Sequence, residues 1–84
     1  MTGKEEITAL VIRLRMYLAI QQLHITKTWE LYDFAAEPLN ISYGRAQNII
    51  SRHKRIKHLS KDECIKELKK KSPVMLKVAM IDLE

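Results

Sequence analysis

The sequence has little of several residue types that mark common protein classes. It contains one cysteine and two glycines among 84 residues. A single thiol, Cys64, cannot form a disulfide within the chain, and this favours a reducing compartment over a secreted, disulfide-bonded scaffold. Two glycines are too few for the glycine-rich loops that cradle phosphates in nucleotide-binding enzymes.

Long hydrophobic runs are also missing. Glu5 and Glu6 precede the first apolar segment, and Arg13 and Arg15 interrupt it well before membrane-spanning length. This pattern fits neither a signal peptide nor a transmembrane helix. Together with the single thiol, it predicts a cytoplasmic protein.

No catalytic or metal-binding constellation can be assembled from the sequence. His53 and His58 are five residues apart, which places them on different faces of a helix, and Cys64 completes no familiar ligand set. The neighbouring Asp62 and Glu63 would raise the pKa of the Cys64 thiol and so would not activate it. We therefore expect no metal, no cofactor and no enzymatic activity.

The residues that are present indicate one small helical domain over 1–84. Hydrophobic residues make up 46% of the chain and charged residues 30%, with two prolines. Such a composition is typical of a globular, helix-rich protein. At this size a single core gives marginal stability, so a homodimer or higher homo-oligomer is expected.

The first helix is predicted from Thr2 and Glu5, which have the spacing of a capping box, and it continues to about Leu23. It carries two apolar stripes. The first stripe comprises Ile7, Leu10, Val11, Leu14, Tyr17 and Leu18, and the second comprises Ile12, Met16, Ile20 and Leu23. The second stripe packs either against another chain or against the later helices, and the sequence leaves both alternatives open.

Three further helices follow from capping signals. Thr28 is expected to cap a helix over about 29–37, whose aromatic residues Trp29, Tyr32 and Phe34 indicate core packing. Ser60 and Glu63 repeat the capping-box spacing. Pro73 fits the first position of a last helix, although the apolar segment 74–83 could also form a strand, and it is a second candidate oligomerisation element.

Charge is distributed unevenly along the chain. No acidic residue occurs between Glu37 and Asp62, and residues 45–71 hold ten Lys or Arg against three Asp or Glu, a net charge of +7. This basic block either binds a polyanion or is a solvated helix surface. Composition alone does not separate the two.

The segment 35–55 favours the polyanion. Ala36 is small enough for close helix packing, Asn40 tolerates left-handed dihedrals, and Ile41 is apolar and can close the corner. Ser42 can cap a following helix over 42–57, in which Ala46 and Ile49 face inward.

This spacing resembles the helix-turn-helix segments of small phage and mobile-element regulators, of phage small-terminase subunits and of sigma-factor-like domains, over about residues 32–52. The motif as a whole is expected over about 29–57. Two positions depart from the pattern: Pro38 would kink or end the first helix, and Asn40 stands where glycine is usual. The resemblance implies that the second helix meets DNA through six residues, namely Ser42, Tyr43, Gly44, Gln47, Asn48 and Ser51.

The sequence thus predicts an all-α domain of four or five helices that binds double-stranded DNA. Side chains of Gln and Asn can pair with adenine edges, and Lys and Arg can neutralise phosphates. The residues expected at phosphates are Arg45, Arg52, Lys54, Arg55 and Lys57. A protein-interaction module, such as a phage-encoded inhibitor or adaptor, and a packaging protein of the small-terminase kind remain alternatives.

Overall fold

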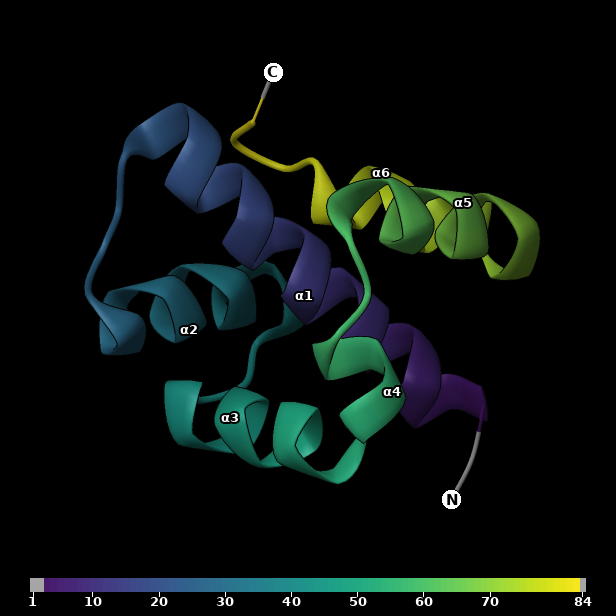
Figure 1. Cartoon of the computed structure of the whole chain (residues 1–84), viewed down its shortest axis with the longest axis horizontal. Helices are drawn as coiled ribbons and strands as arrows, with labels where there is room; N and C mark the ends of the chain where they lie inside the picture. The colour runs from purple at the N-terminus through teal and green to yellow at the C-terminus, as the bar shows by residue number, and fades with distance from the viewer. Residues whose placement is uncertain (1–2, 84) are drawn as a thin grey trace.

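The computed structural model describes residues 3–83, and this part of the chain is entirely helical (Figure 1). Its helices are α1 (Gly3–Leu23), α2 (Thr28–Ala36), the 3-10 turn η1 (Glu37–Leu39), α3 (Tyr43–Arg52), α4 (Lys54–Lys57), α5 (Lys61–Lys71) and α6 (Pro73–Ala79). The all-α prediction is confirmed. The six α-helices between residues 3 and 83 exceed the four or five expected, because the predicted helix 42–57 is divided.

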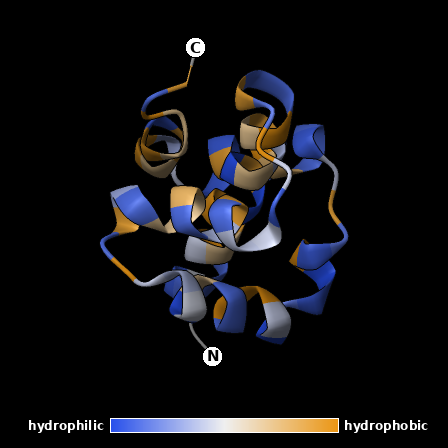
Figure 2. Cartoon of the chain, turned by 90° about the vertical axis from the view of Figure 1, so that its left-hand side faces the viewer, coloured by the Kyte–Doolittle hydropathy of each residue, from blue (hydrophilic) through white to orange (hydrophobic). Residues whose placement is uncertain are grey.

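Helix α1 is the centre of the fold. All five other α-helices pack against it, and hydrophobic positions recur among hydrophilic ones along the helices that surround it (Figure 2). Ile12 and Met16 of the second stripe are buried by these helices, whereas Ile20 and Leu23 remain 48% and 45% exposed. The later helices therefore cover the first half of the second stripe and leave its end open. The capping role expected of Thr2 lies outside the described residues.

Serine side chains cap both α5 and α6, and the sequence predicted the first of these caps. The Ser60 hydroxyl accepts from the Glu63 amide, and the Glu63 carboxylate accepts from the Ser60 amide, so the capping box is complete. The Ser72 hydroxyl accepts from the Met75 amide, and Pro73 takes the first position of α6. The segment after Ser72 is therefore a helix that ends in a turn.

Two predictions about α2 are wrong. Thr28 is itself the first helical residue, so the N-cap position falls on Lys27 and no side chain caps the helix. Tyr32 is buried as expected, but Trp29 is 55% exposed, because the first turn of α2 is not covered by the rest of the described chain. Helical spacing predicts which face of a helix is buried. It does not predict how much of the helix length the neighbouring helices cover.

The end of α2 is decided by Pro38. A proline has no N–H, so the carbonyl of Phe34, four residues earlier, lacks its helical donor. The α-helix ends at Ala36, and the chain continues as the 3-10 turn η1 with Pro38 in its first turn. Arg15 of α1 replaces the missing donor: its Nε and Nη2 donate to the Phe34 oxygen at 3.3 and 3.1 Å.

Arg15 is completely buried and also joins the C-terminal segment to α1. Its Nη1 donates to the carbonyls of Ala79 and Ile81, at 3.1 and 2.8 Å, and its guanidinium lies 4.2 Å from the centre of the Phe34 ring. One cation thus satisfies carbonyls at the ends of two helices. Within residues 3–83, no helix combines the length and apolar character needed to cross a membrane.

Candidate nucleic-acid interface

The segment between α2 and α3 makes a tight turn. Asn40 has left-handed dihedrals, φ 57° and ψ 43°, and its amide donates to the Glu37 carbonyl. Ser42 is extended, and its hydroxyl accepts from the Arg45 amide at 3.1 Å. Ile41 is partly buried against the core. The expected roles of Asn40 in the turn and of Ser42 as a cap are confirmed, and α3 packs against both α2 and α1.

One face of α3 is buried and the other is open to solvent. Ala46 and Ile49 face the core as predicted, and Ile50 joins them. The residues expected to read bases lie on the outer side: five are exposed and Gly44 is half-buried. The exposed five are Ser42, Tyr43, Gln47, Asn48 and Ser51. The structure therefore brings the six residues together at the start and along one side of a single helix.

Gly44 has no internal reason to be glycine. It does not have a positive φ, and a Cβ atom at this position would meet only the Ser42 Oγ, at 3.9 Å. A glycine within a helix is less stable than alanine by roughly 0.5–1 kcal/mol. Neither backbone conformation nor internal packing thus requires the missing side chain.

The expected continuous helix 42–57 is wrong. His53 has φ −108° and ψ 71°, which ends α3 at Arg52, and α4 begins at Lys54. The break turns the chain toward α1 and α5, so that Ile56 becomes buried and Arg55 reaches Glu67. Residues 54–57 consequently do not extend the exposed face of α3 as a straight rod.

Two of the expected phosphate-binding residues contact one carboxylate of α1. The Glu5 Oε2 lies 3.2 Å from Arg52 Nη2 and 3.9 Å from Arg45 Nη2, and both arginine side chains are about half exposed. The Glu5 Oε1 lies 3.1 Å from Nε2 of His53, whose side chain is 8% exposed, so His53 faces inward. These contacts lower the pKa of Glu5, with the His53 hydrogen bond as the largest cause.

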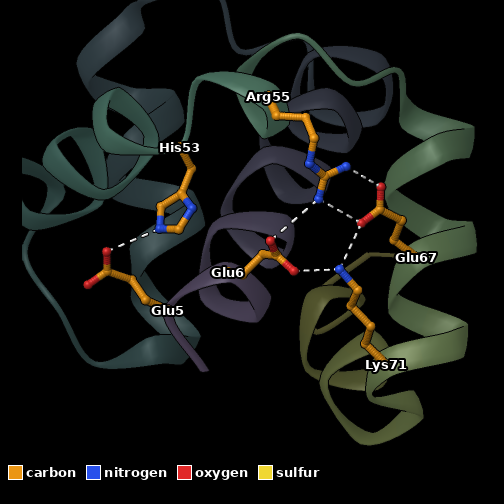
Figure 3. Close-up of polar contacts among 6 residues, drawn as sticks. All are labelled: Glu5, Glu6, His53, Arg55, Glu67 and Lys71. Atoms are coloured by element: carbon orange, nitrogen blue, oxygen red, sulfur yellow. Dashed lines mark hydrogen bonds and ion pairs between the residues drawn. The ribbon is translucent and has the colours of Figure 1, made fainter. Parts of the chain in front are cut away.

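Arg55 belongs to a second, separate group of ion pairs (Figure 3). It donates to both carboxylate oxygens of Glu67, at 2.6 and 3.0 Å, and lies 3.6 Å from Glu6. Lys71 binds Glu6 and Glu67 from the other side. The bidentate hydrogen bonds from Arg55 are the main reason that the pKa of Glu67 falls to about 2. Arg55 therefore joins α4 to α5.

Lys54 and Lys57 differ from the three arginines. Both are exposed, and within the part of the chain that the structure describes neither side chain makes a hydrogen bond or ion pair. The five residues expected at phosphates thus divide into two unpaired lysines and three arginines that already contact carboxylates.

The pairing of the arginines with those carboxylates was not predicted from the sequence. Glu5 and Glu6 lie 40 or more residues before the arginines that they contact, and Glu67 lies on a different helix. The only signal was the lack of any acid between Glu37 and Asp62, since cations without local partners must find distant ones or stay free. That acid-free segment does not indicate which acids pair with the basic residues.

Among residues 3–83 the remaining reactive groups form no further site. Burial of Cys64 raises the pKa of its thiol to about 11, so the acids near it are minor contributors. Residues 3–83 contain no group of three or more side chains that could hold a metal ion.

Comparison of the chain with protein-family models, with curated proteins and with solved structures finds no match. The residues and their geometry therefore carry the functional argument.

Proposed function

We propose that the protein binds duplex DNA by placing α3 in the major groove, as a small regulator of the phage or mobile-element type. In this proposal α2, the turn at Asn40 and α3 act as a helix-turn-helix. One observation carries it: the outer side of α3 is a row of small and amide side chains without an acid. Arg45 and Arg52 lie beside this row, and Lys54 and Lys57 lie just beyond its end.

The residue types suit base recognition. Amide side chains such as Gln47 and Asn48 can donate to and accept from an adenine edge, and a hydroxyl such as that of Ser51 can bond to any base. Tyr43 is 48% exposed in the first turn of α3, where its ring can contact a thymine methyl group. The uncovered cap of α3 is suited to a phosphate, because helix N-termini attract anions.

Gly44 adds a second line of support. A residue that is costly for the helix and is not needed for packing fits a position where another molecule approaches the backbone closely. DNA lying against α3 is such a molecule. We expect Gly44→Ala to leave the free energy of unfolding unchanged or to raise it, and to weaken DNA binding.

The proposal includes a homodimer. Ile20 and Leu23 form an uncovered apolar end of α1, and Val74 and Ile81 are exposed near the other end of the chain. A second copy that covers the end of α1 would complete the stripe that the later helices leave open. Solution mass distinguishes the dimer from a ring of the packaging type.

Binding to duplex DNA tests the function directly. Fluorescence anisotropy against a pool of random duplexes at two salt concentrations detects binding, and selection from the pool gives the preferred site. On that site, Gln47→Ala and Asn48→Ala should each cost about 1–3 kcal/mol, with little change on random duplex. Lys54→Ala should weaken binding to every sequence and reduce the salt slope by about 1.

Lys66→Ala on α5 is the matched control, because it removes an exposed lysine that lies on a different helix. If the amide variants and Lys54→Ala behaved alike, base reading by α3 would be refuted. If no duplex bound even at low salt, the protein would instead fit the interaction-module alternative. The pairing of three arginines with carboxylates favours this second candidate, since these cations are partly neutralised within the chain.

A further inference from the structure

The two groups of ion pairs differ in how firmly they are held. Arg55 and Glu67 form a bidentate pair between two helices, and the Glu67 side chain is 24% exposed. Arg45 and Arg52 each direct one nitrogen toward the same Glu5 oxygen, at 3.9 and 3.2 Å. Exposure is similar in the two groups, at 53% for Arg55 against 50% and 46% for Arg45 and Arg52, and 24% for both Glu67 and Glu5, so the difference lies in the number and length of the contacts. Exposed pairs with one contact add little to stability, so these two arginines can exchange partners at small cost.

The position of Glu5 makes that exchange relevant to α3. Arg45 and Arg52 are seven residues apart, which places both along the same edge of the helix, next to Asn48 on the outer side. Glu5 reaches this edge from the first turn of α1 and is shared by both guanidinium groups. The carboxylate thus engages the same guanidinium groups that would neutralise a phosphate of bound DNA.

We propose that Glu5 is a built-in competitor for phosphate: in the free protein it holds Arg45 and Arg52, and on binding both guanidinium groups pass from Glu5 to the DNA backbone. The inference rests on the proposed DNA binding and adds its regulation. Glu5 then lowers the affinity for every duplex, because its pairs with the two arginines must separate before phosphates can take its place. Random DNA, which is bound by charge alone, is thereby held weakly.

Glu5→Gln tests this competition with little change in shape, since the amide keeps an oxygen for His53. The variant should bind random duplex about fivefold more tightly, the factor that corresponds to the attraction between two opposite unit charges about 4 Å apart in water, which no longer has to be overcome when the arginines move to phosphates. Asp62→Asn is the matched control. It removes the same charge from an exposed residue of α5, and it should change the affinity less than twofold.

A double-mutant cycle separates competition from general repulsion. In a chain carrying Arg45→Ala and Arg52→Ala, Glu5 has no guanidinium left to hold, so Glu5→Gln should gain no more than Asp62→Asn does. The inference is supported by a gain of threefold or more that disappears in this background. A gain that persists there, or a Glu5→Gln effect equal to that of Asp62→Asn, overturns it.

The outcomes also distinguish this inference from the function beneath it. Duplex binding by the unmodified protein with an unchanged Glu5→Gln refutes the competitor role alone. Absence of binding by both proteins at low salt refutes the proposed function and the competitor role together. A thermal melt of each variant, monitored by circular dichroism, verifies that the folded state is the one measured.

Discussion

Replacing Arg15 with methionine should strongly destabilise the fold, although the new side chain is apolar and unbranched. The guanidinium donates to three carbonyls, those of Phe34, Ala79 and Ile81. Methionine fills much of the same space and donates to none of them. The Phe34 carbonyl would then have no helical donor, because Pro38 lacks an N–H.

The expected loss follows from these carbonyls. A hydrogen bond from a charged donor contributes about 1.5–3 kcal/mol, and a buried group left without its partner costs about 1–3 kcal/mol. Removing the buried cation relieves part of this, because its own desolvation is unfavourable and lowers the pKa of Arg15. We therefore expect Arg15→Met to lower the free energy of unfolding by about 3–5 kcal/mol, a large part of the total of a chain this small.

Arg13→Met is the matched control, since it makes the same replacement two residues earlier in α1. Arg13 donates to the Tyr17 hydroxyl at 2.8 Å, and its Nε is buried without a hydrogen-bond partner in the part of the chain that the structure describes. Its loss should change stability by less than about 1 kcal/mol. Urea unfolding followed by circular dichroism measures both variants. Equal losses, or a loss below 1 kcal/mol for Arg15→Met, would refute the capping argument.

Two further predictions concern the turn and the ion pairs. Asn40 has a positive φ, so Asn40→Val should cost about 1–2 kcal/mol while Asn40→Gly should not destabilise; equal melting temperatures would contradict this. Arg55 lowers the pKa of Glu67 from the ordinary 4.5 to about 2, so the unfolded chain binds the proton first on acidification. This contribution is complete above about pH 4.5 and disappears as the pH falls toward 2; at a partly exposed site we expect about 1 kcal/mol. Glu67→Gln should flatten the stability profile over this range, and an unchanged profile would refute the assignment.

Local physical chemistry made much of the fold predictable. A cap needs one hydroxyl and an amide three residues later, so Ser42 and Ser60 could be recognised from neighbouring residues. The turn at Asn40 depends on the dihedral preference of one side chain. The exposed and buried sides of α3 follow from the helical spacing of its polar and apolar residues. These features require no knowledge of the rest of the chain.

The features that the sequence did not reveal depend on distant residues. Trp29 is exposed because the rest of the described chain does not cover the first turn of α2. The break at His53 results from how the chain after α3 packs on α1. The buried position of Arg15 is the clearest case. An arginine in an apolar stripe is normally expected at the surface, and only the fold brings it to carbonyls 19 to 66 residues away.

The basic residues comprise unpaired lysines and arginines paired with carboxylates, and this division determines the salt dependence expected for DNA affinity. Each neutralised phosphate contributes about −0.9 to the slope of log affinity against log salt. If Lys54 and Lys57 alone met the backbone, the slope would be about −2, and if Arg45 and Arg52 joined them it would be about −4. A Glu5 carboxylate released beside DNA takes up a cation, which offsets part of the larger value. Under the proposed exchange, the unmodified protein therefore lies between these limits, and Glu5→Gln moves it toward −4. A slope that stays near −2 in both proteins would mean that Arg45 and Arg52 do not reach phosphates, whether or not Glu5 holds them.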